Sequence, residues 1–362
     1  MLFICLQLYF LLWCSLMIGI LDLFGSVPKR ILLFGVGGGG DVVSAAMLGL
    51  WFRRYGFKTF IGAVAWERFV IDPLPGPLPF NTFYNIEKIS DNVIAVTKDT
   101  YAIRGSKKIK PQVAYVSEVI NEYVYVVDLW GGVNDYRAGV GKLIEYLDVD
   151  AIIIVDVGGD ILATGHEDNL WSPLADSMGL ACFNSFNNCV LAVHGLGADG
   201  ELDPSYLLSR ISLIAKEGGL LGAKGITLYE ARVLEQILSK AISEASKIPL
   251  LAYKGFYGEY PVRKGTRKVY VTPLQTIMFF LDTHVVYKNS PIAPIVDNTN
   301  SLEEANSKLN SLGIYTEYNL EKDLLRHSDK PLDPQNILYI REKYRNLMRS
   351  KISKKSSSNL YK

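Results

Sequence analysis

The sequence predicts an α/β fold in which a mostly parallel sheet carries helices on both faces. Short apolar runs, typical of buried strands, alternate with segments of helical periodicity along almost the whole chain. Residues 151–155 are rich in β-branched side chains, as expected for a strand that is buried on both faces. Such alternation places the strands parallel, because each helix returns the chain to the same end of the sheet.

Composition and charge agree with a globular protein that binds a small molecule. The chain has 362 residues, of which 49% are hydrophobic and 21% charged, enough for one large domain. Lys and Arg number 38 against 37 for Asp and Glu, so no general field attracts nucleic acid. No repeat or clear linker is visible. We therefore expect a single domain over residues 27–330, a helix over 331–350 and a disordered basic tail over 351–362.

The N-terminal leader, residues 1–26, is open to three interpretations. Residues 2–21 carry no charge and are long enough to span a bilayer. No Lys or Arg precedes them, which disfavours a signal peptide, whereas Lys29 and Arg30 would keep the domain in the cytoplasm. Alternatively, Met17 is the true start, or the segment is a packed helix. We expect a cytoplasmic protein, with membrane contact only if the leader is an anchor.

The first elements are a strand at 31–36, a helix at 41–54 and a strand at 59–64. Residues 72–79 contain four prolines, which exclude helix and central strand and predict a stiff surface loop, a candidate lid. The further strands expected are 93–97, 123–129, 151–155, 190–194, 268–272 and 276–281. The further helices expected are 112–121, 135–147, one ending at Gly218-Gly219, one from Thr227 to about 247, one from Ser301 and a last one from Asp333.

Helix starts are marked by capping residues. Asp203 followed by Pro204 is typical of an N-cap and first helical residue. Thr227 with Glu230 forms a capping box, and Ser301 with Glu304 repeats this spacing. We also expect Asp135 to cap the helix that follows Gly131-Gly132.

The first candidate site is the loop after the first strand. It contains a G-x-G-x-x-G pattern and opens a helix, so that a ligand can approach the backbone and free N–H groups can bind an anion or nucleotide. An ordinary dinucleotide site is disfavoured, because no acid ends the second strand and Asp41 would lie beside a pyrophosphate. Asp41 could instead simply cap its helix. The candidate ligand-binding residues here are Gly37, Gly38, Gly39, Gly40 and Asp41.

Two further loops combine glycine with carboxylates. Asp156 and Asp160 flank a turn containing Gly158 and Gly159, where they could hold Mg²⁺ or ligand hydroxyls, or merely form a tight turn. Asp199 and Glu201 follow the strand at 190–194; they are candidates for the same contacts, or they belong to a loop leading to Asp203. Glu167 and His166, between these loops, are candidate general acid/base groups.

Other chemistries lack their motifs. Cysteines 5, 14, 182 and 189 form no CxxC pair, so neither a disulfide framework nor a zinc site is expected, and a reducing compartment fits best. Nothing in the sequence indicates haem. There is no G-x-S-x-G elbow and no H-E-x-x-H. Cys182 and Cys189 stand among apolar residues and are expected to be inert core thiols.

Three motifs in order resemble the archaeal and bacterial domain-of-unknown-function family numbered 1152. They are Gly37-Gly-Gly-Gly-Asp41-Val-Val, then Asp156-Val-Gly-Gly-Asp160-Ile-Leu with Ser172-Pro-Leu-Ala-Asp176, and Gly195-Leu-Gly-Ala-Asp-Gly-Glu-Leu202. The resemblance covers about residues 31–283. It implies a Rossmann-like, doubly wound α/β fold and a cytosolic protein, and it implies no known activity. The leader before Met17 departs from the family pattern.

Several carboxylates in one cleft repel each other unless a cation relieves them. We therefore expect an enzyme, hydrolase or transferase, that binds a nucleotide-, phosphate- or sugar-containing ligand with Mg²⁺ on Asp41, Asp156 and Asp160. Proton transfer would fall to Asp156, Asp160, Glu167 or His166. The alternative is a non-catalytic ligand sensor or scaffold with the same pocket, favoured by the lack of an identifiable nucleophile. A homo-oligomer remains open.

Overall fold

The structure is a computed structural model that describes residues 23–329 and 331–359. Most of the N-terminal leader, residues 1–22, lies outside the described residues, so its three interpretations stay predictions. Within the described part of the chain, no helix combines the length and the apolar character needed to cross a bilayer.

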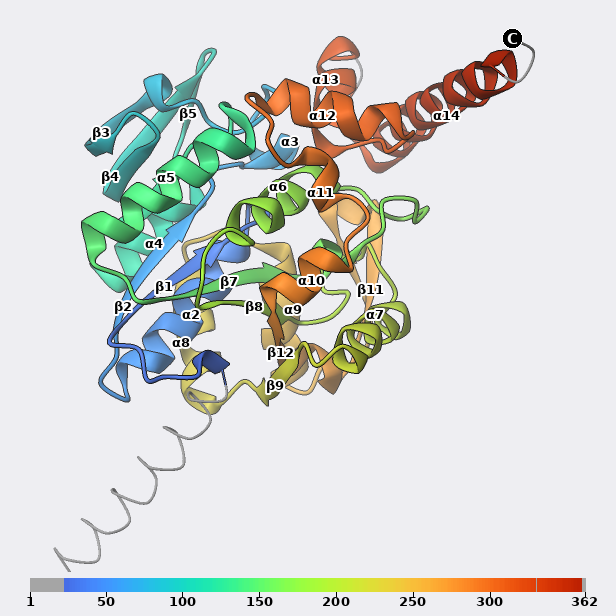
Figure 1. Cartoon of the computed structure of the whole chain (residues 1–362). Helices are drawn as coiled ribbons and strands as arrows, with labels where there is room; N and C mark the ends of the chain where they lie inside the picture. The colour runs from blue at the N-terminus through green and yellow to red at the C-terminus, as the bar shows by residue number, and fades with distance from the viewer. Residues whose placement is uncertain (1–22, 330, 360–362) are drawn as a thin grey trace, which may run out of the picture.

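Five parallel strands form the centre of the main sheet and confirm the predicted α/β fold (Figure 1). Their order across the sheet is β6 (Val124–Val127), β2 (Lys58–Ala63), β1 (Arg30–Gly35), β7 (Ala151–Val157) and β8 (Cys189–His194). The chain builds outward from β1 to β2 and β6, and then crosses to the other side of β1 to form β7 and β8. This is the doubly wound arrangement, and its order reverses between β1 and β7.

Antiparallel strands extend the sheet at both edges. On one side β8 pairs with β12 (Ile277–Asp282), which pairs with β9 (Leu220–Gly225). On the other, β6 pairs with β4 (Val93–Arg104), which carries β3 (Phe83–Ser90) and β5 (Lys107–Ile109). A separate hairpin joins β10 (Gly258–Val262) to β11 (Arg267–Val271). The sequence patterns missed β3, β5, β9 and β10, because each has at most one buried residue and gives no apolar run.

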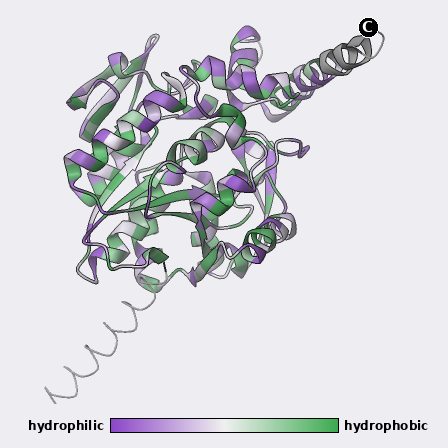
Figure 2. Ribbon diagram, in the orientation of Figure 1, coloured by the Kyte–Doolittle hydropathy of each residue, from purple (hydrophilic) through white to green (hydrophobic). Residues whose placement is uncertain are grey.

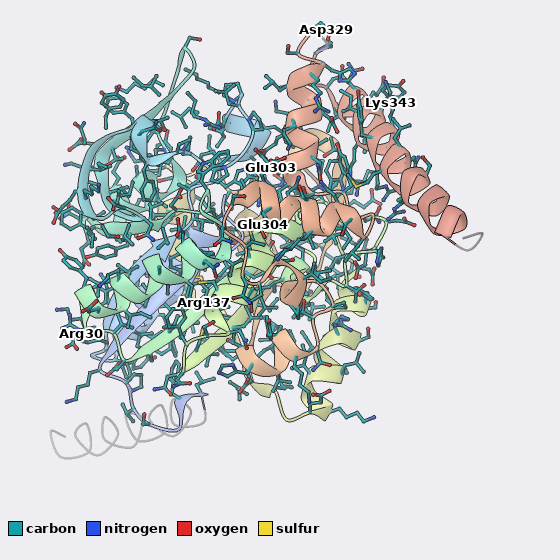
Figure 3. All side chains as sticks on the ribbon, turned by 45° about the horizontal axis from the view of Figure 1, so that its top comes forward. Arg30, Arg137, Glu303, Glu304, Asp329 and Lys343 are labelled. Atoms are coloured by element: carbon teal, nitrogen blue, oxygen red, sulfur yellow. The ribbon has the colours of Figure 1, made fainter. Side chains whose placement is uncertain are left out.

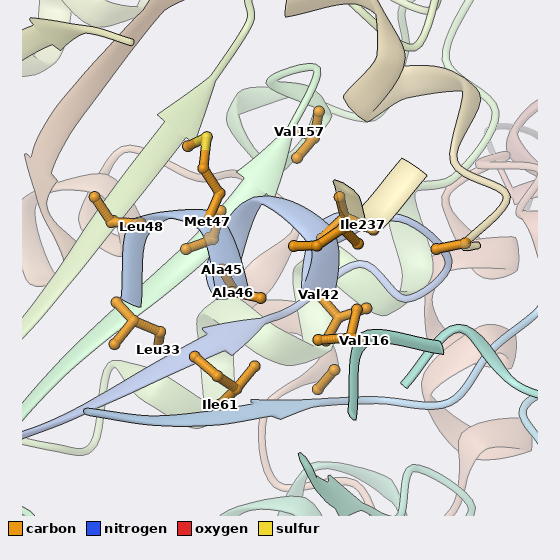
Figure 4. Close-up of a cluster of buried hydrophobic side chains, with 14 of the residues drawn as sticks. Leu33, Val42, Ala45, Ala46, Met47, Leu48, Ile61, Val116, Val157 and Ile237 are labelled. Carbon is orange, nitrogen blue, oxygen red and sulfur yellow. The ribbon is translucent and has the colours of Figure 1, made fainter. Parts of the chain in front are cut away.

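Helices cover both faces of the sheet, and alternate strand residues point to opposite faces. Ile31 and Leu33 pack with one group of helices, and Leu32 and Phe34 with the other. The first group contains α2 (Asp41–Arg53), α4 (Gln112–Ile120) and α8 (Leu228–Leu238); the second contains α5 (Gly132–Leu147), α6 (Pro173–Phe183) and α7 (Pro204–Lys216). Figure 4 shows the core between α2 and the strands, and Figure 2 the hydrophobic central strands.

Two helix predictions are wrong at their ends. The helix expected from Thr227 to about residue 247 is two helices: α8 has the predicted capping box, but α9 (Glu244–Tyr253) starts separately after Ser243. The Ser243 side chain accepts the N–H of Ser246 and so caps a new helix. Asp135 caps nothing, because α5 already begins at Gly132 and Asp135 lies in its first turn.

The proline-rich loop is pinned to the body of the protein. Its Asp72 carboxylate lies 2.9 Å from Nε of Arg104 in a buried ion pair. The N–H of Gly76 donates to the Glu321 carboxylate at 2.8 Å, and Leu78 is buried. The segment is therefore packed structure and does not stand free as a surface lid.

The C-terminal part of the chain is helical and packs against α5 and α6, on one face of the sheet. It consists of α10 (Thr283–Lys288), α11 (Ala293–Val296), α12 (Leu302–Ser311), α13 (Glu317–Arg326) and α14 (Pro334–Asn359). Ser301 caps α12 as predicted. Helix α14 projects from the body and continues past residue 350, where a disordered tail was expected, because lysine favours the helix there (Figure 1). Charged side chains such as Glu303 and Lys343 project from these outer helices (Figure 3).

Candidate functional site

A small cavity lies at the carboxyl ends of β1 and β7, where the strand order reverses. This is the position at which doubly wound sheets bind ligands, because the loops after the two strands turn to opposite faces. Its volume is about 30 Å³. A water molecule needs roughly 10–15 Å³, so the cavity holds an ion or a few atoms of a ligand. The lining residues are Gly37, Gly38, Gly39, Gly40, Asp41, Arg68, Asp156, Val157, Asp160, Ser172, Asp176, Asp199, Glu201, Ala245 and Arg263.

Three buried aspartates from separate elements meet in this cavity. Asp41 is the first residue of α2, Asp156 belongs to β7, and Asp176 lies in the first turn of α6. One carboxylate oxygen of each lies within 4.8 Å of the other two. Oδ2 of Asp156 and Oδ1 of Asp176 are buried without a hydrogen-bond partner among the described residues. We refer to these three residues as the aspartate triad.

Asp41 also joins the two loops. Its Oδ2 accepts the N–H of Gly37 at 2.7 Å, and its Oδ1 accepts the N–H of Val157 at 3.2 Å. It does not cap α2, whose N-cap is Gly40 and has no side-chain cap bond. The interpretation of Asp41 as a simple helix cap is therefore wrong, because its carboxylate bonds backward to the loops after β1 and β7.

A second acidic group adjoins the triad, and one of its members, Glu201, has a cationic partner, whereas Oδ2 of Asp199 is buried without a hydrogen-bond partner among the described residues. Asp160, Asp199 and Glu201 each offer an oxygen within 4.8 Å of the others. Glu201 pairs with Nη1 of Arg267 at 2.6 Å and accepts hydrogen bonds from Ser172 Oγ and from the N–H groups of Trp171 and Ser172. Asp160 accepts a second contact from Ser172 Oγ at 3.0 Å. The triad has no ion pair of this kind among the described residues.

Burial raises the pKa of every carboxyl in these two groups except that of Glu201. Burial, followed by the charges of Asp41 and Asp199, raises the pKa of Asp156 well above its usual range. Burial likewise raises the pKa of Asp176 and Asp160 well above theirs, and it raises the pKa of Asp41 and Asp199 to about 7. Glu201 is the exception: burial opposes its ionisation, but Arg267 and the hydrogen bonds lower its pKa.

Arginines close the opposite side of the cavity. Arg68 lies over the Trp66 ring, donates to the carbonyl of Gly37 at 2.5 Å and pairs with Glu317 at 3.1 Å. Arg68 has φ +58° and Arg263 φ +53°, a left-handed conformation that costs non-glycine residues about 1 kcal/mol or more. Such strain concentrates at functional sites. Neither arginine was predicted, because Arg68 begins the one-turn helix α3 (Arg68–Ile71) and Arg263 the 3₁₀ turn Arg263–Gly265, and neither short element carries a motif.

Glu317 of α13 completes this side of the site. Its two carboxylate oxygens accept the N–H groups of Leu174 at 3.0 Å and Ala175 at 2.9 Å, at the start of α6. An acidic group is stabilised there by the free N–H groups and the helix dipole. The C-terminal helices thus hold α6, and with it Asp176, in position.

Some of the predicted site residues line the cavity and others do not. Asp41, Asp156, Asp160, Asp199, Glu201 and the four loop glycines all line the cavity, whereas Glu167 and His166 do not. Glu167 instead accepts the N–H groups of Thr164 and Gly165 and the hydroxyl of Tyr206, which fixes its own loop. His166 is exposed. Asp176 was missed as a site residue, although it belongs to the Ser172–Asp176 motif.

The glycines at the site keep room for carboxylates. A Cβ on Gly158, whose φ is +126°, would lie 2.5 Å from Cγ of Asp199. Gly159 also has positive φ, +103°, and starts the 3₁₀ turn Asp160–Leu162. These two glycines let the chain turn sharply between Asp156 and Asp160.

We expect Gly37→Ala to destabilise the protein by about 1–3 kcal/mol, the cost of overpacking. The added Cβ would lie 2.5 Å from Oδ1 of Asp176 and 2.7 Å from Oδ2 of Asp41, and both carboxylates would have to move. Urea denaturation measures the change. Gly141→Ala in α5 is the matched control, since its Cβ meets nothing within 4 Å and alanine favours a helix. Equal stability of the two variants would contradict this account.

Comparisons with known proteins agree with the motif resemblance. The family described as "Protein of unknown function (DUF1152)" matches residues 32–325, which includes the main sheet, the cavity and α13 as far as Leu325. No curated protein and no solved structure matches the chain. The match extends over most of the sequence, and the chain therefore belongs to the DUF1152 family.

Proposed function

We propose that the aspartate triad binds a divalent cation, Mg²⁺ in the first place, and that the protein is an enzyme acting on a phosphate- or sugar-containing small molecule at this cation. The observation that carries the proposal is that Asp156 and Asp176, which cluster with Asp41, each have a buried oxygen without a hydrogen-bond partner among the described residues.

Electrostatics support a cation at the triad. Within the described residues, no Lys, Arg or His forms an ion pair with Asp41, Asp156 or Asp176. Burying an unpaired carboxylate costs several kcal/mol, and a nearby like charge adds to this cost. A divalent cation would offset both terms. Three carboxylates form a hard, all-oxygen ligand set, which favours Mg²⁺, Mn²⁺ or Ca²⁺ over zinc or copper.

The surroundings of the triad favour an anionic ligand group beside the cation. The Gly37–Gly40 loop leads into the N-terminus of α2, where N–H groups are available to anions. Arg68 and Arg263 face the carboxylates across the cavity. A phosphoryl group bonds to Mg²⁺ and to arginine alike. With about 30 Å³ available, only the reacting end of a nucleotide or sugar phosphate enters, and the rest lies outside.

Asp160 is the best placed proton donor and acceptor. It lies at the same cavity as Asp156, and burial raises its pKa well above its usual range, the direction that a general acid requires. A bound Mg²⁺ would polarise a phosphoryl oxygen and position a water molecule. These groups are suited to hydrolysis or group transfer. We assign the proton transfer in this reaction to Asp160.

Titration of the full chain with Mn²⁺, followed by electron paramagnetic resonance, tests the cation site. We expect saturable binding by the wild type that Mg²⁺ displaces. Absence of Mn²⁺ binding would reject the proposal.

Turnover separates an enzyme from a ligand-binding sensor with the same pocket. The Mg²⁺-loaded protein is incubated with a panel of nucleotides, sugar phosphates and free sugars. We expect release of product with at least one phosphate-containing compound, and loss of that activity in Asp156→Ala. Binding of a panel compound without any turnover would favour the sensor.

A further inference from the structure

A second small cavity adjoins the acidic one and has the opposite charge. Its volume is about 30 Å³, and it shares Arg68, Ser172 and Arg263 with the acidic cavity. Its remaining lining residues are Phe69, Trp171, Arg267, Glu317, Leu320 and Glu321. A ligand group that extends from one cavity to the other would therefore touch the aspartate side at one end and arginines at the other.

Three arginines meet there with unequal partners. Arg68 pairs with Glu317 and Arg267 with Glu201. Arg263 is half-buried, and its guanidinium has no hydrogen bond or close ion pair with any residue that the structure describes. Its backbone is bound: the N–H donates to Glu244 at 2.8 Å, and the carbonyl accepts from Thr266 Oγ1 at 2.8 Å. Burial and the charge of Arg267 lower the pKa of Arg263, so this cation lies in an unfavourable place.

Arg267 also has a donor group without a hydrogen-bond acceptor. Its side chain is 8% exposed, and its Nε is buried without a partner although Nη1 binds Glu201. A buried donor without an acceptor costs about 1–3 kcal/mol. The positive φ of Arg263 adds strain in the same turn, and this conformation places the guanidinium at the boundary of the two cavities. An oxyanion at this boundary would satisfy both arginines.

We infer that Arg263 is a phosphate-binding residue, whose guanidinium receives the phosphate of a ligand that reaches the aspartate triad from the second cavity. The inference rests on the proposed function and narrows its substrate class to phosphate-containing compounds, excluding free sugars. Arginine binds a phosphate in a bidentate manner, and phosphate oxygens would be the acceptors that the Arg263 guanidinium and Nε of Arg267 lack among the described residues. Carboxylates across the boundary would repel the phosphate unless a cation lies between them, so phosphate and cation should bind cooperatively.

Calorimetric titration with inorganic phosphate, using the full chain with and without saturating Mg²⁺, tests this. We expect phosphate to bind the wild type more tightly with Mg²⁺ than without it. In Arg263→Gln phosphate affinity should fall by about tenfold or more, and Mg²⁺ affinity should remain within about twofold. Lys264→Gln, an exposed positive charge in the same turn, is the matched control and should bind phosphate like the wild type.

The outcomes separate the two proposals. Failure of Mg²⁺ or Mn²⁺ to bind the wild type overturns the proposed function. Normal Mg²⁺ binding with no phosphate binding, or with equal phosphate affinity in Arg263→Gln and wild type, overturns only the assignment of Arg263. If Arg263→Gln unfolds, Arg263→Lys keeps the charge but loses the bidentate fork, and wild-type phosphate affinity in that variant would contradict the assignment.

Discussion

Replacing Asp156 by asparagine is expected to raise the stability of the metal-free protein and to abolish its binding of Mn²⁺. Asp156 is 1% exposed, and its Oδ2 has no partner among the described residues. The charges of Asp41 and Asp199 oppose its ionisation. Asparagine has nearly the same shape and removes this cost, so we expect a gain on the order of a few kcal/mol. The same change removes one of the three proposed cation ligands.

Asp203→Asn is the control for this substitution. Asp203 is the exposed N-cap of α7, and asparagine caps a helix as well as aspartate does. Asp203→Asn should therefore resemble the wild type in its melting temperature, measured with EDTA, and in its Mn²⁺ affinity, measured by titration. A lower melting temperature of metal-free Asp156→Asn, together with intact Mn²⁺ binding, would show that the carboxylate is needed for the fold and does not hold a cation.

The metal-free protein should lose stability as the pH rises from about 4 to about 7. Asp41 and Asp199 have a folded pKa of about 7 against an ordinary value of 3.8, so the folded state holds more protons in this window. Each such group costs up to about 1.4 kcal/mol of stability per pH unit. Glu67 and Glu321, raised to about 7 by burial, act in the same direction.

His194 opposes this trend over part of the range. Burial lowers its pKa from 6.5 to about 3, so the folded state holds fewer protons there and its contribution to stability grows as the pH rises to 6.5. One imidazole does not offset the carboxylates, so stability should fall over the whole range, less steeply near pH 7, where Asp41 and Asp199 begin to lose their protons in the folded state. Urea denaturation at several pH values with EDTA measures how the free energy of unfolding changes with pH. Saturating Mg²⁺ should flatten the curve, because bound cation replaces the protons; a curve unchanged by Mg²⁺ would count against the site.

Much of the site could be predicted from the sequence because parallel strands end at one edge of the sheet. Asp41, Asp156 and Asp199 each follow or end a buried strand, and that alone brings them together. Asp176 could not be assigned with equal ease, since its place depends on how α6 packs. Arg68 and Glu317 lie far apart in the chain, and only tertiary packing makes them partners.

The fold shows the same division between local and distant information. Buried strands such as β7 and capped helices such as α7 and α12 carry their signals in a few neighbouring residues. The order of β8, β12 and β9 carries no such signal, because an apolar run indicates burial but not direction or neighbour. Strand β11 was expected from its alternating pattern but its partner β10 was not, and the turn between them brings Arg263 and Arg267 to the site.

The insertion of β12 between β8 and β9 imposes an order on biosynthesis. Strand β8 is fully buried in the finished sheet, yet its outer neighbour begins only at Ile277. While the ribosome adds the intervening residues, β8 offers an apolar edge with unpaired backbone groups, and β9 has no strand to join. The nascent chain is thus prone to self-association until β12 pairs with β8 and β9.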